Sequence, residues 1–198
     1  SLYAIAFRPV TFSDVPESAW YANAVSFIAA RDITTGTGGG NYSPEAKLTR
    51  ADFLVLMMRA YEIAPDANPT DNFSDAGSTY YTGYLAAAKR LGISGGVGDN
   101  KFAPEQAITR QELFTLLYNA LKVLGELPTG DTGMTLSDFS DSGEVASWAT
   151  EALSTLVKSG ALSGSGGKLN PTDTTTRAQM AQVLYKAMSV EPAAVVAG

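Results

Sequence analysis

The chain has 198 residues, of which 45% are hydrophobic, so it is long enough to bury a core in one large or two modest domains. Its formal net charge of −6 and its pI near 4.6 argue against a nucleic-acid binder, because such a protein needs a basic face to displace phosphate counterions. The absence of cysteine and histidine excludes disulfides, thiolate or imidazole metal ligands, and nucleophiles that depend on those side chains. We expect neither a membrane span nor a retained signal peptide, since the sequence shows no apolar run of about eighteen residues and no charged-then-apolar leader.

Three copies of one pattern fill most of the chain. They begin with the segments FSDVPESAW, FSDAGSTYY and FSDSGEVASW, at Phe12, Phe73 and Phe139. From this phenylalanine to a later Thr-Arg pair is 38, 37 and 38 residues, and a glycine-rich stretch ending in proline always lies between them. An internal repeat of this kind indicates one structural unit used three times.

Each copy is predicted to form a first amphipathic helix that opens at an aromatic residue: Trp20, Tyr80 or Trp148. Gly92 and Gly160 fall where glycine commonly ends a helix, and Asp32 occupies that place in the first copy. The opening aromatic has two interpretations. It presents an apolar face to a sugar ring, or it belongs to the core.

The glycine-rich stretches are GTGGGNYSP, GGVGDNKFAP and GSGGKLNP. The glycines of these loops have two interpretations. They permit positive φ and so let a ligand approach the backbone closely, or they serve only to close the loop. The glycines considered for ligand binding are Gly36, Gly38, Gly95, Gly96, Gly98, Gly164, Gly166 and Gly167. The repeated aspartates have two interpretations as well, accepting hydrogen bonds from sugar hydroxyls or capping the turn ahead of the first helix; they are Asp14, Asp75 and Asp141.

A second helix is predicted to start at LTRADF, ITRQEL and TTRAQM, with threonine as the N-cap and Asp52 completing a capping-box pattern in the first copy. This places an arginine at the first helical position each time, where the helix dipole disfavours a cation by about 0.3 to 1 kcal/mol; these are Arg50, Arg110 and Arg177. One broad apolar face follows, and two helices alone cannot bury it. We therefore expect the three copies to pack on one another.

The order Phe-x-Asp, aromatic, glycine-rich loop and Thr-Arg-x-acid or amide resembles the S-layer homology (SLH) family over about residues 12–188. Departures are Tyr80 in place of tryptophan and Gln179 where the family more often has an acid. The resemblance implies an all-α fold of three tandem helix-loop-helix repeats, assembled as one pseudo-threefold domain with a central bundle of helices and inter-repeat grooves. Linkers rich in proline, aspartate and glycine predict repeats at 1–63, 64–124 and 125–190, with a linker or tail at 191–198.

The resemblance also implies a function. SLH modules bind secondary cell-wall polysaccharide linked to peptidoglycan, often carrying pyruvylated N-acetylmannosamine, and hold surface proteins non-covalently on the bacterial cell wall or in its S-layer. We accordingly expect an extracellular module that is monomeric in isolation, with no cofactor, no metal and no direct membrane insertion.

For the arginines we consider two hypotheses. In the first, unpaired backbone N–H groups of the first helical turn and the guanidinium together bind the ketal carboxylate of a pyruvylated sugar. Charge-assisted hydrogen bonds worth about 1.5 to 3 kcal/mol would exceed the dipole penalty. In the second, each arginine reaches a carboxylate of its own protein, such as Asp14, Asp75 or Asp141, as a structural tie.

An enzyme is not expected, because a catalytic site is normally unique in a domain whereas every distinctive polar residue here occurs three times. Carboxylates for acid-base work on a glycosidic bond are available, but nothing in the pattern selects one pair. A protein-protein interaction module of a surface lattice remains as the alternative, and it would use exposed apolar patches.

Overall fold

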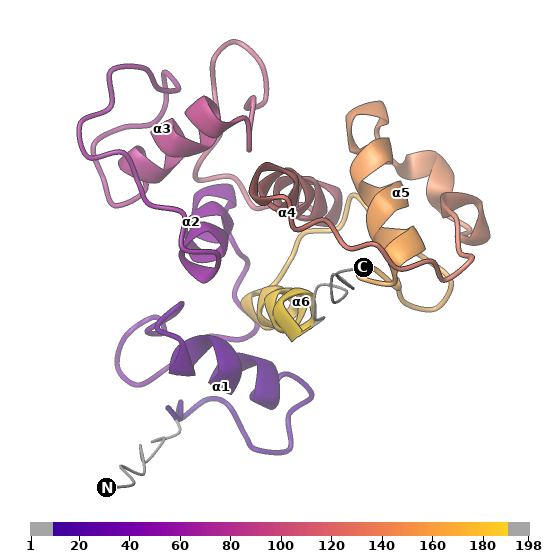
Figure 1. The fold of residues 1–198 in the computed structure, drawn as a ribbon. Helices are drawn as coiled ribbons and strands as arrows, with labels where there is room; N and C mark the ends of the chain where they lie inside the picture. Colours follow the sequence, from indigo (N-terminus) through magenta and orange to yellow (C-terminus); the bar gives the residue numbers. More distant parts are fainter. Residues whose placement is uncertain (1–9, 190–198) are drawn as a thin grey trace, which may run out of the picture.

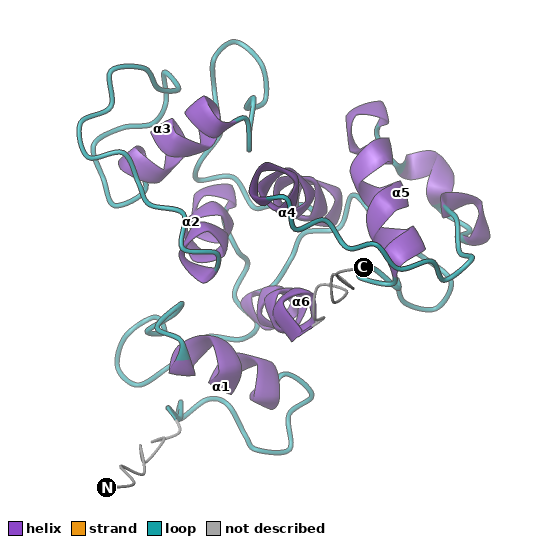
Figure 2. Ribbon diagram, in the orientation of Figure 1, coloured by secondary structure: helices purple, strands orange, loops and turns teal. Residues whose placement is uncertain are grey.

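The computed structural model describes residues 10–189, which form helices joined by loops, with only isolated β-bridges and no strand among these residues (Figure 2). The all-α prediction is confirmed. The α-helices are α1 (Ala22–Ala30), α2 (Arg50–Ala60), α3 (Thr82–Leu91), α4 (Arg110–Leu124), α5 (Thr150–Ser159) and α6 (Arg177–Ser189). Three short 3-10 helices precede α5: η1 (Leu136–Asp138), η2 (Ser142–Glu144) and η3 (Ser147–Ala149).

The second helices of the three repeats, α2, α4 and α6, lie at the centre, and the first helices, α1, α3 and α5, lie outside them (Figure 1). Each outer helix packs on the central helix of the preceding repeat: α3 on α2, α5 on α4, and α1 on α6. The last of these contacts joins the first repeat to the third. The repeats therefore pack on one another as expected, while exact pseudo-threefold symmetry stays a prediction.

The central helices begin where the sequence predicts. Thr49, Thr109 and Thr176 each accept a hydrogen bond from the amide three residues later, and an arginine follows as the first helical residue. The predicted apolar face is buried. Its fully buried members include Phe53, Met57, Leu113, Met180 and Leu184.

A closed ring of backbone hydrogen bonds links the segments that lead into the central helices. Leu48 N donates to Thr175 O at 3.0 Å, Ile108 N to Leu48 O at 2.9 Å, and Thr175 N to Ile108 O at 3.0 Å. Each repeat thus donates one bond and accepts one. Because the ring joins residues far apart in sequence, it fixes the three helix N-termini relative to one another.

The start of each outer helix differs from the prediction. The aromatics that open the first helix lie just before it, since α1 begins at Ala22 and Trp148 lies in η3. Tyr80 likewise precedes α3. The tail at 191–198 lies outside the described residues. Within residues 10–189, every helix is too short or too polar to cross a membrane.

Candidate functional site

Each of the three arginines ties one repeat to the next. Arg50 Nε donates to Phe102 O at 2.9 Å, Arg110 Nε to Leu169 O at 2.8 Å, and Arg177 Nε to Tyr42 O at 2.8 Å. The acceptor is always the aromatic or apolar residue two positions before the proline of the neighbouring loop. Each arginine thus joins two repeats through Nε, and none of the three forms an ion pair with Asp14, Asp75 or Asp141. A role of the arginines in binding a ligand stays a prediction.

The same loops also pair the backbone amides of the first helical turn. Arg50 N donates to Gln106 O at 2.8 Å and Ala51 N to Pro104 O at 3.0 Å, and α4 and α6 repeat the pattern with their own neighbours. The third amide of each helix donates to the threonine cap. The hypothesis that unpaired amides help to bind an anion is thus wrong, because carbonyls of the next repeat already occupy them. Only the terminal guanidinium nitrogens are left to meet a ligand.

The repeated aspartates hold the other side of the same loop residues. Asp14 accepts from the amides of Tyr42 and Ser43, both at 2.8 Å, and Asp75 and Asp141 make the corresponding pairs of bonds in their own repeats. These carboxylates cap the loop before the second helix, and not the turn ahead of the first, which corrects that expectation. Burial by itself raises the pKa of Asp14, but the two amides and the nearby Arg177 leave the pKa below its ordinary value.

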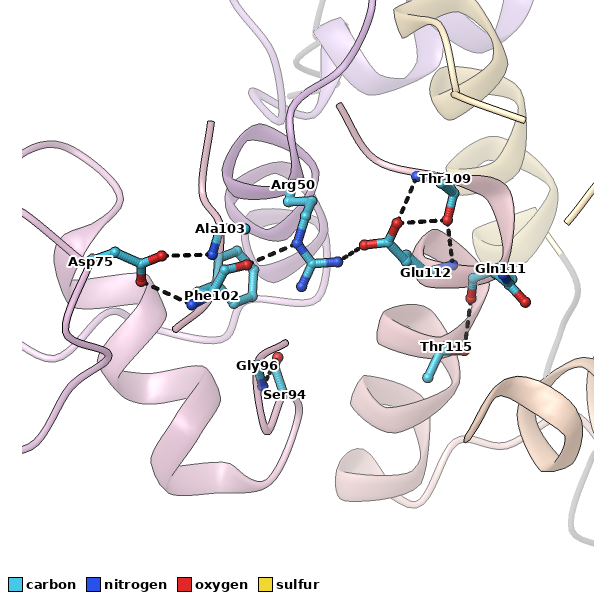
Figure 3. Close-up of polar contacts among 10 residues, drawn as sticks. All are labelled: Arg50, Asp75, Ser94, Gly96, Phe102, Ala103, Thr109, Gln111, Glu112 and Thr115. Atoms are coloured by element: carbon cyan, nitrogen blue, oxygen red, sulfur yellow. Dashed lines mark hydrogen bonds and ion pairs between the residues drawn. The ribbon is translucent and has the colours of Figure 1, made fainter. Parts of the chain in front are cut away.

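A groove of about 680 Å³ lies where Arg50 of the first repeat meets the loop 93–97 and α4 of the second. Trp148 of the third repeat completes its wall, so all three repeats contribute. Figure 3 shows Arg50 between the Phe102 carbonyl and Glu112, whose carboxylate forms an ion pair with the guanidinium. The remaining polar lining comes from Ser94, Gln106, Thr115 and Asn119.

Arg50 itself is 4% exposed. Burial lowers its pKa to about 10, although the negative charge of Asp75 acts in the opposite direction. The guanidinium is still fully protonated at neutral pH. The wall of the groove therefore contains a positively charged Arg50 paired with a negatively charged Glu112, and both side chains have little contact with solvent.

The opening aromatics are the most exposed large apolar side chains near the grooves, with Trp20 and Tyr80 each 61% exposed and Trp148 57%. The interpretation that they belong to the core is therefore wrong. Their chain neighbours Tyr21, Tyr81 and Ala149 are the buried residues. Tyr80 OH donates to Asp52 of α2, which places Tyr80 beside the first turn of that helix. Because α1 packs on α6 as α3 packs on α2, we expect Trp20 to lie beside the first turn of α6.

The loop glycines divide into two groups. A Cβ on Gly96 would lie 2.2 Å from Lys101 O and 2.8 Å from the Phe73 ring, and Gly36 and Gly164 are equally crowded. These three shape the loop. By contrast, a Cβ on Gly38, Gly98 or Gly166 would meet nothing within 4 Å. Of the candidate glycines, Gly95 and Gly96 line the groove at Arg50.

Sequence reasoning did not single out Glu112, Gln106, Thr115 or Asn119. Thr115 and Asn119 lie three and seven residues after Glu112 on one face of α4, and that spacing was the available signal. Among residues 10–189, no group of three or more acidic side chains could hold a metal ion.

A family model described as the S-layer homology domain matches residues 11–54, 72–114 and 138–181, more than half of the chain. This chain belongs to the S-layer homology family. Each SLH match runs from the start of a repeat into the second helix, and so includes the phenylalanine, the aspartate, the loop and the arginine described above.

Several relatives contain a similar SLH region. Over 182 residues the chain is 30% identical to the S-layer protein sap of Bacillus anthracis, covering 92% of this chain and 22% of that protein. It is 30% identical over 184 residues to the S-layer protein EA1 of Bacillus anthracis, covering 91% and 20%. An uncharacterized cell wall amidase of the same organism is 29% identical over 180 residues, covering 88% and 31%. The chain thus spans about a fifth of the two S-layer proteins and under a third of the amidase.

Proposed function

We propose that this SLH domain anchors a surface protein to the bacterial cell wall by binding secondary cell-wall polysaccharide, with pyruvylated N-acetylmannosamine as the recognised unit. Membership of the family and the similarity to S-layer proteins support cell-wall anchoring. The domain acts as a binding module and not as an enzyme, although the amidase shows that a protein named for a reaction also contains such a region.

The observation that carries the proposal is the groove at Arg50. Its volume of about 680 Å³ suits a saccharide unit, because small-molecule sites commonly enclose about 300 to 1,000 Å³. Trp148 offers an exposed apolar ring face, and Thr115 and Asn119 offer hydrogen-bonding groups for hydroxyls and an acetamido group. The Arg50 guanidinium adds a positive charge to the groove wall, with Nε bonded to the Phe102 carbonyl and Nη1 paired with Glu112.

The test is retention on purified wall polysaccharide, prepared with and without its pyruvyl groups. We expect strong retention only with the pyruvyl groups present. The variant Trp148→Ala should reduce the affinity of the Arg50 groove by about tenfold without lowering stability, because the ring is exposed and its removal takes away contact with the sugar alone. Val123→Ala, another exposed apolar residue that does not line the groove, is the matched control and should bind normally.

Two results would contradict the proposal. Equal retention on polymer with and without pyruvyl groups would remove the acidic sugar as the recognised unit. Failure to bind either polymer, together with self-association of the domain, would favour a lattice interaction module instead.

A further inference from the structure

The three arginines look alike in sequence but differ in what faces their terminal nitrogens. The difference comes from the third residue of the neighbouring repeat's central helix. At Arg50 that residue is Glu112, which pairs with the guanidinium. The equivalent residue is Gln179 of α6 for Arg110, and Asp52 of α2 for Arg177. All three arginines use Nε in the same way, as ties to a carbonyl. The difference therefore lies only in the terminal nitrogens that a ligand would meet.

At Arg50 the protein supplies its own anion. The two oxygens of Glu112 have separate roles: Oε1 accepts from Thr109 N at 3.3 Å and completes the helix cap, while Oε2 pairs with the guanidinium. The side chain of Glu112 is 13% exposed, so the pair lies in a poorly solvated place where an ion pair is strong. An acidic ligand at Arg50 therefore meets a guanidinium whose charge Glu112 already partly neutralises through Nη1.

At Arg110 the corresponding residue is an amide. Gln179 Oε1 accepts from Thr176 N at 3.0 Å and so performs the same cap as Glu112. Its second terminal atom is an NH₂ group, which donates hydrogen bonds and cannot neutralise a cation. Within residues 10–189 no carboxylate lies within 4.0 Å of the Arg110 guanidinium, and Arg110 as a residue is part-buried where Arg50 and Arg177 are buried.

Other charges near Arg110 act in both directions. Lys186 lies where Asn119 lines the first groove and donates to Ser163 at 3.3 Å, so it adds a cation beside the third loop. Asp173 stands where Gln106 lines the first groove and adds an anion, but it forms no ion pair with Arg110. At Arg177, Asp52 instead accepts from Tyr80 OH and forms no ion pair with that arginine.

We infer that the three arginine sites are graded by an internal competitor: the site at Arg110 takes the acidic sugar first, and the site at Arg50 takes it last because Glu112 already pairs with its guanidinium. This inference rests on the proposed function, since it concerns how the same acidic unit is distributed among the grooves. Glu112 and Gln179 are specificity-determining residues for that binding. A carboxylate at this helix position weakens binding of the acidic sugar to the facing arginine, and an amide does not.

The chain carries its own reporters for the test. It has only two tryptophans: Trp148 lines the groove at Arg50, and Trp20 is expected beside the first turn of α6, which faces the site at Arg110. The Arg50 and Arg110 sites should therefore each have one indole N–H signal in a proton–nitrogen NMR spectrum. The probe is the methyl glycoside of pyruvylated N-acetylmannosamine, and the same glycoside without the pyruvyl group is the control ligand. In the unaltered protein, the Trp20 signal should shift at concentrations at least about tenfold lower than the Trp148 signal.

Two reciprocal variants then separate the effect from a loss of structure. Glu112→Gln keeps the cap, as Gln179 does naturally, and should lower the midpoint for Trp148 by about tenfold while leaving Trp20 unchanged. Gln179→Glu removes no contact and should raise the midpoint for Trp20 by a similar factor. With the glycoside that lacks the pyruvyl group, neither variant should change either midpoint.

Failures of the two proposals are distinguishable. If both indoles shift at the same concentration in the unaltered protein, and neither variant changes this, the grading is wrong while acidic-sugar binding stands. If neither indole responds to the pyruvylated glycoside in any of the three proteins, the proposed function fails, and the grading fails with it.

Discussion

At the scale of single residues, each loop before a central helix is held from both sides. In the third repeat, Asp141 accepts from the amides of Leu169 and Asn170 at 2.8 and 2.7 Å, while Arg110 of the second repeat donates to the Leu169 carbonyl. The aspartate bonds lie within one repeat and the arginine bond crosses between two. Asp141, which closes the loop, and Arg110, which joins two repeats, thus both bind the backbone of Leu169.

Asp141 should make stability depend on pH. Burial by itself raises the pKa of Asp141, but the two amides reverse this and leave the pKa below its ordinary value of 3.8. The folded state therefore binds fewer protons than the unfolded state near that pH. The contribution to stability is complete above the unfolded-state pKa and is lost as pH falls through the lower native pKa.

We expect Asp141→Asn to lower the free energy of unfolding by about 2 kcal/mol at neutral pH, because one amide loses a charged acceptor. At about pH 3 the difference from the unaltered protein should be smaller, since this pH lies below the ordinary pKa of 3.8 and the unfolded chain then binds more protons at this carboxyl than the native state does. Urea unfolding at both pH values measures this, with the exposed residue Glu45 as the control in Glu45→Gln. A difference that is the same at both pH values would contradict the assigned role.

Residue-scale predictions from sequence succeeded where the interaction is local. The threonine caps join residues three apart, so the pattern Thr-Arg-x-acid or amide was enough to place the start of each central helix. The arginine bonds join residues 52, 59 and 135 apart in the chain. No local rule gives such partners, and this is why the carbonyl acceptors and the paired first-turn amides were missed.

At the scale of elements, the loop 93–97 is both tightly packed and part of the wall of the groove at Arg50. Gly96 turns the chain with φ +80° so close to Lys101 O and the Phe73 ring that no side chain fits. Its neighbour Gly95 has open space around it, and both line the groove at Arg50. The glycine-rich composition was therefore a sound signal for the loop, but only the packing shows which glycine is essential.

Gly96→Ala should destabilise the protein by about 2 to 4 kcal/mol, because its Cβ would lie 2.2 Å from Lys101 O and the backbone conformation disfavours a side chain. Gly95→Ala is the matched control, and we expect a change within about 0.5 kcal/mol. Thermal or urea unfolding of both variants gives the comparison. Equal effects at the two positions would show that the crowding around Gly96 is relieved at little cost.

At the scale of the whole molecule, the net charge of −6 opposes long-range attraction to an acidic polymer. On the proposed function, recognition must therefore come from short-range contacts such as those in the groove at Arg50. Equivalent sites at the other two arginines would let one domain engage successive units of one polymer or neighbouring strands, and each further contact would benefit from a high effective concentration. Modest affinity in each groove is then compatible with firm retention on a wall.

The sequence predicted that the repeats pack together, but not which helix packs on which. Periodicity shows that a helix has an apolar face and does not identify the surface that covers it. In the structure α1 packs on α6, with Phe27 and Tyr185 in edge contact at 4.9 Å, although α1 and α6 lie at opposite ends of the chain. The repeats are consequently interlocked and not stacked as separable units.

This interlocking predicts that the domain unfolds as one cooperative unit. Leu184 of α6 is fully buried, and Leu184→Ala should lower the free energy of unfolding by about 2 to 5 kcal/mol. Native-state hydrogen exchange should then show an equal loss of protection for the slowest amides of α6 and of α3. Helix α3 is informative because it packs on α2 and not on α6. If the repeats were independent units, the protection of α3 would be unchanged while α1 and α6 alone became labile. Exposed Ser189→Ala, on the same helix, controls for effects of substitution that do not involve the core.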